Sequence, residues 1–320
     1  MTAEPSLAAS SGASKLPRPE PLCYDSLIVS TVGMIGLGLL GHALASRLLA
    51  AGHEVVGYDV LASKVAALVA RGGKAAASVA DVAARAGTVC VALPTLDSVE
   101  DTILGAGRLA AHARPGSVVV QMSTISPALT EQLAREVTAR GLAFLDCPVS
   151  GTSTMVARGD GIFICGGEEA IFARSRPLLE SMLPRAVYVG PAGHAMFAKL
   201  VANLLVGVHS LAAAEALTMA RRAGLDLDRV LDVLTSGAAS SRMLEVRGPM
   251  IAREDFPPQM KLDLFMKDLH LIQEAAARVG APLPLTDVAE RLYAATLQAG
   301  HGAEDLAVVV KALGALGVRP

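Results

Sequence analysis

The hydrophobic pattern of this chain changes character near residue 195. Before that point, short apolar runs of strand length alternate with amphipathic stretches of helical length such as residues 127–140. The runs expected to form strands are residues 27–35, 55–59, 88–93, 117–122, 142–146 and 162–165. Such alternation predicts βα units and therefore a doubly wound (Rossmann) α/β domain.

Beyond that point only helical patterns recur. The expected helices are residues 195–223, 227–234, 242–252, 262–279, 285–299 and 305–316. We therefore predict an α/β domain at residues 28–192 and an all-helical domain at residues 193–320. Residues 1–27 are rich in Ser, Ala and Pro and are expected to form a disordered tail.

A glycine-rich turn follows the first predicted strand. Its spacing is G-x-G-x-x-G, and a helix, a second strand and an acid at Asp59 come after it. In this context the glycines allow a tight turn, close approach of a pyrophosphate and close packing of helix on strand. The residues expected to hold a dinucleotide here are Gly36, Leu37, Gly38, Leu39, Leu40, Gly41, Tyr58, Asp59 and Val60.

The acid at the end of the second strand predicts NAD rather than NADP. The Asp59 carboxylate can accept hydrogen bonds from the ribose hydroxyls and would repel a 2′-phosphate. Val60 follows where an arginine would favour the phosphate. Lys64 is the only basic residue close by, and we expect it inside the next helix.

Polar and turn residues cluster after the later predicted strands. Pro94 follows one strand, Ser123 and Thr124 follow another, and Ser150 and Gly151 follow a third. In open α/β sheets ligands bind at this edge. Capping of the helix that begins at residue 127 is an equally good explanation of Ser123 and Thr124.

Lys199 and Asn203 lie on one face of the long apolar helix expected at residues 195–223, together with Val206 and Ser210. A lysine whose ammonium group reaches the helix edge, with an asparagine bonded to a loop, would be a purely structural explanation. A buried lysine that exchanges a proton with a ligand, beside an asparagine, is the functional one.

Composition limits the kinds of partner that we expect for this chain. Hydrophobic residues make up 52% of the 320 residues and the formal net charge is −2, so neither nucleic acid nor an anionic membrane is an expected partner. The apolar run at 200–220 contains Asn203, His209 and Glu215, so we expect no stretch to reach a membrane span.

The cysteines and histidines exclude some kinds of site. Cys23, Cys90, Cys147 and Cys165 make no C-x-x-C motif, which suggests free thiols in a reducing compartment, the cytoplasm. No pair of histidines has metal-ligand spacing, and we expect no metal.

Together these motifs resemble the β-hydroxyacid dehydrogenase family over about residues 32–311. The matching segments are the glycine turn MIGLGLLG, DCPVSG at 146–151, the lysine signature at Gly190, Gly193, Ala195, Lys199 and Asn203, and KDL at 267–269. The segments at residues 204–215 and 262–269 look closest to sugar-acid members such as threonate and tartronate semialdehyde dehydrogenases.

The resemblance implies roles for particular residues. Lys199 would be the catalytic general acid and base, with Asn203 orienting it and holding substrate. A small hydroxy acid would bind at Ser123, Ser150, Gly151 and Thr152. The cofactor would also touch Leu93, Pro94, Thr124 and Lys267. The resemblance further implies a homodimer or homotetramer formed through the helical domain.

The chain departs from the family pattern around the substrate. Ala195 replaces a glycine of the lysine signature, and Thr152 replaces the second glycine of the usual SGG. Further departures are Ser98, Gln121, Met155, Val156 and Asp160. The nucleotide and lysine chemistry survive these changes, so the substrate pocket is where this chain should differ from well-known members.

Two other functions fit parts of the pattern. A small-aldehyde or imine reductase shares the architecture, but imine reductases usually have another residue at the position of Lys199. A non-catalytic dinucleotide sensor would keep the glycines and lose the lysine face. Because both features are present, we favour an NAD-dependent 3-hydroxyacid dehydrogenase.

Overall fold

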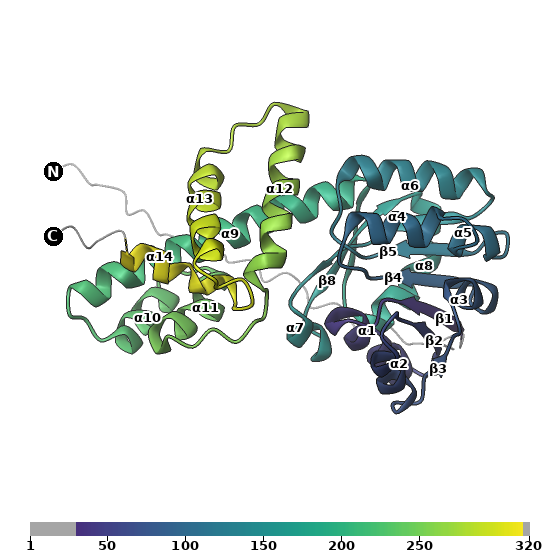
Figure 1. Cartoon of the computed structure of the whole chain (residues 1–320), viewed down its shortest axis with the longest axis horizontal. Coiled ribbons are helices and arrows are strands. Elements are labelled where there is room, and N and C mark those ends of the chain that lie inside the picture. Colours follow the sequence, from purple (N-terminus) through teal and green to yellow (C-terminus); the bar gives the residue numbers. More distant parts are fainter. Residues whose placement is uncertain (1–29, 316–320) are drawn as a thin grey trace, which may run out of the picture.

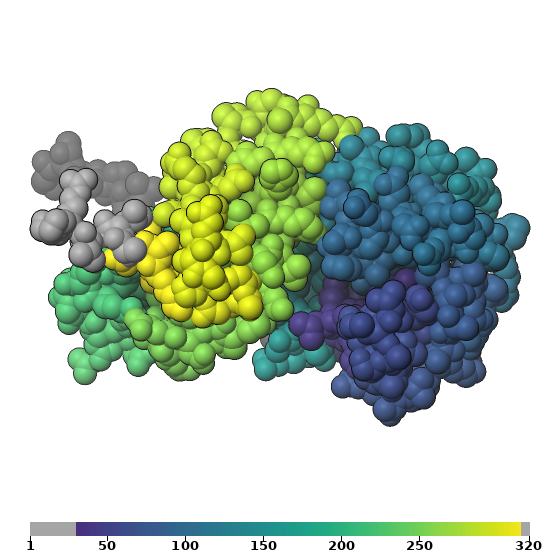
Figure 2. Space-filling view, in the orientation of Figure 1, coloured from purple at the N-terminus to yellow at the C-terminus, as the bar shows by residue number. Residues whose placement is uncertain are grey.

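A computed structural model describes residues 30–315 of the chain, so the predicted tail at 1–27 and Cys23 lie outside the described residues. Figure 1 shows two lobes, one built on a sheet and one built only of helices. Figure 2 shows the lobes in contact, with the early residues in one and the green and yellow residues in the other. The predicted fold class is confirmed.

The sheet has a parallel body and a mixed edge. Its order is β3-β2-β1-β4-β5-β6-β8-β7, and β9 also pairs with β8. The parallel strands are β1 (Thr31–Ile35), β2 (Glu54–Tyr58), β3 (Lys74–Ala75), β4 (Thr88–Val91), β5 (Val118–Gln121) and β6 (Ala143–Asp146). At the edge, β8 (Ile162–Gly167) runs antiparallel to β6 and to β7 (Val149–Ser150), and parallel to β9 (Ala186–Gly190).

Helices cover both faces of this sheet because successive strand residues point to opposite sides. Val32 and Met34 of β1 belong to one core cluster, whereas Ile35 belongs to another. The first cluster includes residues of α1 (Leu39–Ala50), α2 (Ala62–Val69), α7 (Ser153–Ala157) and α8 (Glu169–Met182). The second includes residues of α3 (Val79–Arg85), α4 (Leu96–Leu104), α5 (Leu109–His112) and α6 (Pro127–Ala139).

The helical lobe has a core of its own. Its elements are α9 (His194–Arg222), α10 (Leu227–Ser236), α11 (Arg242–Arg253), α12 (Leu262–Val279), α13 (Pro284–Gln298), the 3₁₀ turn η1 (Leu306–Val309) and α14 (Val310–Ala315). At its centre Phe265 and Tyr293 meet edge to face, with ring centroids 5.7 Å apart. The expected helix at 305–316 is divided into η1 and α14.

Helix α9 contributes to both lobes. Met196 packs in the second core cluster of the sheet lobe, and Leu200 packs in the core of the helical lobe. By length and composition alone α9 is apolar enough to span a membrane, with mean hydropathy 1.6, so the expectation that no segment reaches such a span was wrong. The helix packs against both cores, and 44% of its most apolar 18-residue window is buried.

Three polar contacts join the lobes beside α9. From α12, Lys267 Nζ donates to Thr124 O at 2.6 Å, and Arg278 donates to both carboxylate oxygens of Glu131 at 2.9 Å. Arg242, at the start of α11, lies 3.6 Å from Asp160, which follows α7. In Figure 1 α12 crosses α9, and α7 and α11 lie below it.

A buried ion pair joins α11 to the segment before α12 and to the start of η1. Arg247 and Asp305 are both almost fully buried, and Arg247 Nε donates to Asp305 Oδ1 at 2.9 Å. The same carboxylate accepts the backbone N–H groups of Gln259, Met260 and Ala307. One side chain therefore fixes two loop segments to α11.

We predict that Arg247→Met lowers the free energy of unfolding by about 3–5 kcal/mol, because it leaves the Asp305 carboxylate buried without its counter-ion. Denaturant unfolding followed by circular dichroism measures this. Arg229→Met is the matched control, since Arg229 is exposed and lies 3.9 Å from Asp226. Equal stability of both variants would contradict a stabilising role for the buried pair.

Candidate active site

The glycine turn joins β1 to α1 in a shape that leaves room at the helix N-terminus. A Cβ on Gly36 would lie 2.1 Å from Ala92 O, and one on Gly41 would lie 2.0 Å from Gly36 O. A Cβ on Gly38 would meet no atom of the described part of the chain within 4 Å. Gly38 is the N-cap of α1 and gives it no side-chain cap, so the first N–H groups of α1 face a space that fits a pyrophosphate.

The other predicted residues of the turn differ in exposure. Leu37 is buried, whereas Leu39, the first residue of α1, is 76% exposed, and Leu40 is half-buried. Leu39 therefore has the most side-chain surface open to a ligand at the helix start.

Asp59 is held firmly at the end of β2. Its carboxylate accepts Leu37 N at 2.8 Å and Leu61 N at 2.9 Å, so it joins the glycine turn to the start of α2. Lys64 lies in α2 as expected, but its Nζ is 3.4 Å from Asp59 Oδ2. An ammonium group therefore lies beside the carboxylate, which the sequence argument did not foresee. Tyr58 is half-buried and Val60 is exposed.

Ser123 supports a loop in this structure. It is buried, its Oγ accepts Leu93 N at 2.8 Å, and its backbone is bonded on both sides by the Gln121 side chain. The Leu93–Pro94 turn is thus tied to the end of β5, with Pro94 exposed at its tip. Gln121 was recognised in the sequence only as a departure from the family, because nothing local shows its contact.

The predicted substrate loop lies at the edge of the sheet. Ser150 ends β7, and Gly151 has φ +149°, a backbone conformation that favours glycine. Thr152 caps α7, since its Oγ1 accepts Met155 N at 3.2 Å. Its side chain is directed to the helix, which gives this departure from the family a structural reason.

Lys199 and Asn203 are both buried in α9, with exposed fractions of 8% and 3%. Asn203 Nδ2 donates to Asp268 Oδ2 at 2.8 Å, and Lys267 Nζ lies 3.3 Å from Asp268 Oδ1. Helix α12 therefore brings a carboxylate and a second lysine to the predicted catalytic pair. Asp268 was missed in the sequence, although it is part of the KDL segment.

The charged groups of this cluster shift one another's pKa values. Burial lowers the pKa of Lys199, nearby Asp268 raises it in part, and Lys267 lowers it again. Burial raises the pKa of Asp268, and the two lysines oppose that shift. A lysine whose ammonium form is disfavoured can accept a proton nearer neutral pH than an exposed lysine can.

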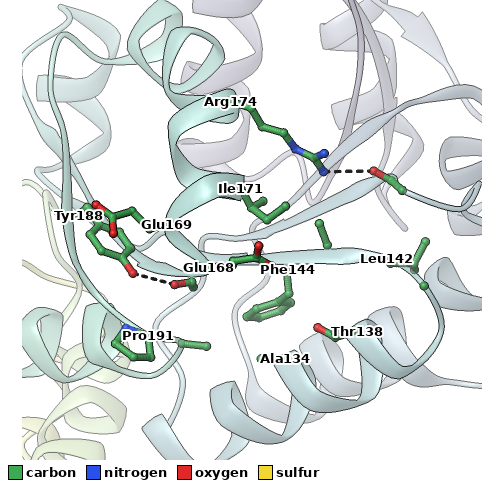
Figure 3. Close-up of a pocket in the computed structure, with 15 residues that line it drawn as sticks. Ala134, Thr138, Leu142, Phe144, Glu168, Glu169, Ile171, Arg174, Tyr188 and Pro191 are labelled. Atoms are coloured by element: carbon green, nitrogen blue, oxygen red, sulfur yellow. Dashed lines mark hydrogen bonds between the residues drawn. The ribbon is translucent and has the colours of Figure 1, made fainter.

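A hollow of about 550 Å³ lies elsewhere, between α6 and α8 (Figure 3). Tyr188 Oη donates to Gly167 O at 3.0 Å, and Arg174 Nη2 donates to Gly116 O at 3.4 Å. None of the predicted site residues lines this hollow. We assign no chemistry to this hollow.

Models of known protein families match both lobes of the chain. Residues 31–190 match the model for the NAD binding domain of 6-phosphogluconate dehydrogenase. Residues 192–313 match the model described as NAD-binding of NADP-dependent 3-hydroxyisobutyrate dehydrogenase.

Individual relatives agree with these matches. An L-threonate dehydrogenase of Cupriavidus necator is 34% identical, over 88% of this chain and 95% of that protein. An NAD-dependent L-serine dehydrogenase of Pseudomonas aeruginosa is 33% identical, over 88% and 96%. A 3-hydroxyisobutyrate dehydrogenase structure from Salmonella typhimurium has TM-score 0.81 and 34% identity, over 88% and 99%. The chain belongs to the β-hydroxyacid dehydrogenase family, and the predictions of an oxidoreductase with an NAD-binding domain are confirmed.

We predict that Asp268→Asn lowers the pKa of Lys199 further, because it removes the negative charge that favours the ammonium form. Mass spectrometry of acetic anhydride labelling at a series of pH values measures this, since only the neutral amine reacts. Lys74, exposed and paired with Glu54, is the internal control. An unchanged pH dependence at Lys199 would show that Asp268 carries no effective charge there.

Proposed function

We propose that this chain transfers a hydride between a small 3-hydroxy carboxylic acid and NAD, with Lys199 as general base in oxidation. The observation that carries the proposal is a buried lysine of lowered pKa, one helix turn from Asn203, between the dinucleotide and helical lobes. Such a group is suited to take a hydroxyl proton and to return it to a carbonyl in the reverse direction.

The proposed active-site residues have different roles in this mechanism. NAD, which the glycine turn and Asp59 would hold, would supply the acceptor for the hydride. Lys199 Nζ takes the hydroxyl proton, and Asn203, held by Asp268, orients substrate and lysine. Ser150 and Gly151 bind the substrate carboxylate through hydroxyl and backbone N–H.

The substrate class is taken from the relatives. One of them is named for L-threonate and another for L-serine, which are small acids with a hydroxyl group on the third carbon. This supports our proposal of a 3-hydroxy acid, with sugar acids the favoured group. Departures at Thr152 and Asp160 lie in and after the substrate loop, so the preferred acid need not be that of either relative.

The proposal is tested with a panel of 3-hydroxy acids and NAD, followed by absorbance of the reduced cofactor. We expect turnover of at least one free acid and little turnover of its methyl ester, because the ester lacks the anchored carboxylate. A cyclic imine with reduced cofactor forms the second arm. Turnover of the imine alone would favour an imine reductase instead.

We predict that Lys199→Met lowers kcat roughly 100-fold or more while NADH still binds, since it removes the acid–base group and keeps the volume. Steady-state kinetics and a fluorescence titration with NADH measure the two effects. Lys74→Met is the control, because it removes an exposed lysine that is distant from Lys199 in the sequence. A Lys199→Met enzyme with most of its activity would remove the lysine from the mechanism.

We also propose self-association through the helical lobe. Large apolar side chains are exposed on it, among them Val201 and Leu205 one turn apart on α9, and Met219 and Val233. A homodimer or homotetramer would cover them. Sedimentation at the rate of a monomer would contradict this.

Two further expectations remain proposals. The two family models meet between residues 190 and 192, which supports the predicted division of the chain at 192–193. Cys90, Cys147 and Cys165 are buried free thiols, which supports a cytoplasmic location. Limited proteolysis and fractionation of the native host would test these expectations.

We predict that the enzyme prefers NAD to NADP by about tenfold or more in kcat/KM, because the Asp59 carboxylate repels a 2′-phosphate. Lys64 offsets part of that repulsion, so Lys64→Ala should increase the preference, and Asp59→Asn with Val60→Arg should reverse it. Kinetics with both cofactors for the three proteins give the answer. A wild type that prefers NADP would overturn the role of Asp59.

A further inference from the structure

Asp146 makes a contact that none of the roles above uses. It ends β6, is fully buried, and its Oδ2 accepts Gly193 N at 3.2 Å and Met196 N at 3.0 Å. These two N–H groups belong to the start of α9. Its Oδ1 is buried and has no hydrogen-bond partner among residues 30–315.

Helix α9 depends on this distant carboxylate for its cap. Gly193 is the N-cap residue, has φ +92° and no side chain, and so cannot satisfy the free N–H groups of the first turn. Asp146, 47 residues earlier in the chain, supplies the acceptor instead. A carboxylate at a helix N-terminus is also favoured by the helix dipole.

The position of this cap ties together two parts of the proposed active site. Asp146 opens the DCPVSG segment, four residues before Ser150, and Met196 is three residues before Lys199. The backbone of Asp146 is fixed in the sheet, because it pairs with Gly166 of β8 and with Gln121 of β5. One side chain thus links the strand that leads to the carboxylate anchor with the helix that carries the lysine.

We propose that Asp146 is a positioning residue, which sets Lys199 and Asn203 at a fixed distance from the substrate loop by capping α9 from the end of β6. This rests on the proposed function only for the effect on turnover. The capping itself follows from the two hydrogen bonds and the burial.

The neutral form of the side chain should serve nearly as well as the charged form. Burial raises the pKa of Asp146 to about 7, and the N–H groups of Met196 and Gly193 oppose that shift. An amide oxygen accepts the same N–H bonds, and Asn is a good N-cap residue. Asp146→Asn is therefore the conservative variant, and Asp146→Ala removes the acceptor.

The experiment compares Asp146→Ala, Asp146→Asn and Asp226→Ala with the wild type. Asp226 caps α10 through the N–H groups of Asp228 and Arg229, so its loss is a matched loss of a helix cap away from Lys199 in the sequence. Hydrogen exchange of the peptide spanning residues 193–200, kcat, KM and NADH affinity are measured for each.

For Asp146→Ala we expect the hydrogen-exchange rate of residues 193–200 to rise roughly tenfold. We expect kcat to fall roughly tenfold. NADH affinity should stay within about twofold, because the glycine turn and α1 are untouched. Asp146→Asn should restore kcat to within a few-fold, and Asp226→Ala should leave exchange at 193–200 unchanged. If Asp146→Ala does not fold, Asp146→Ser replaces it, since a serine hydroxyl is too short to reach both N–H groups.

Unchanged exchange at 193–200 in the Ala or Ser variant would overturn the capping role. Faster exchange with unchanged kcat, or a kcat that the Asn variant does not restore, would overturn the positioning role. If the wild type oxidises no hydroxy acid, the proposed function fails by itself. The positioning role is then decided by the rate of Lys199 acetylation, which must change in Asp146→Ala and return in Asp146→Asn.

Discussion

Helix α9 has to pack against two hydrophobic cores while carrying a lysine and an amide away from water. Met196 belongs to the core under the sheet and Leu200 to the core of the helical lobe, so Lys199 lies at the junction between them. An ammonium group is costly there unless other charges and hydrogen bonds compensate. The surrounding structure can be understood as that compensation.

The compensation comes from α12. A single turn of this helix presents Lys267 and Asp268, the second of which accepts a hydrogen bond from Asn203. Burial disfavours the ammonium form of Lys199 and lowers its pKa, Asp268 offsets part of that shift, and Lys267 limits the offset. The acid–base behaviour proposed for Lys199 is thus a property of two helices together.

Local patterns predicted the elements well where a helix has clear signals at its ends. The range 262–279 agrees with α12, because its apolar repeat ends at Gly280, which adopts φ +68°. The strand β7 has two residues and was not found, since a run that short has no periodicity. The family resemblance, and not periodicity, supplied the roles of Lys199 and Ser150.

What the sequence could not give are contacts between distant residues. The bond from Asn203 to Asp268 spans 65 positions, and the bonds that Asp146 accepts span 47 and 50. No local spacing encodes such pairs, because they depend on how strands and helices stack. Lys64 shows the same limit at short range, since its helix was predicted correctly but its contact with Asp59 was not.

The polar contacts between the lobes differ in how they respond to dissolved salt. Lys267 and Arg278 attach α12 to the sheet lobe, one from its second turn and one from its last. The exposed pair of Arg242 and Asp160 also bridges the lobes. Dissolved salt screens an exposed pair far more than buried contacts. Arg278 and Glu131 are also partly exposed, so salt weakens both ion pairs between the lobes, while the buried cluster around Lys199 keeps its charge balance.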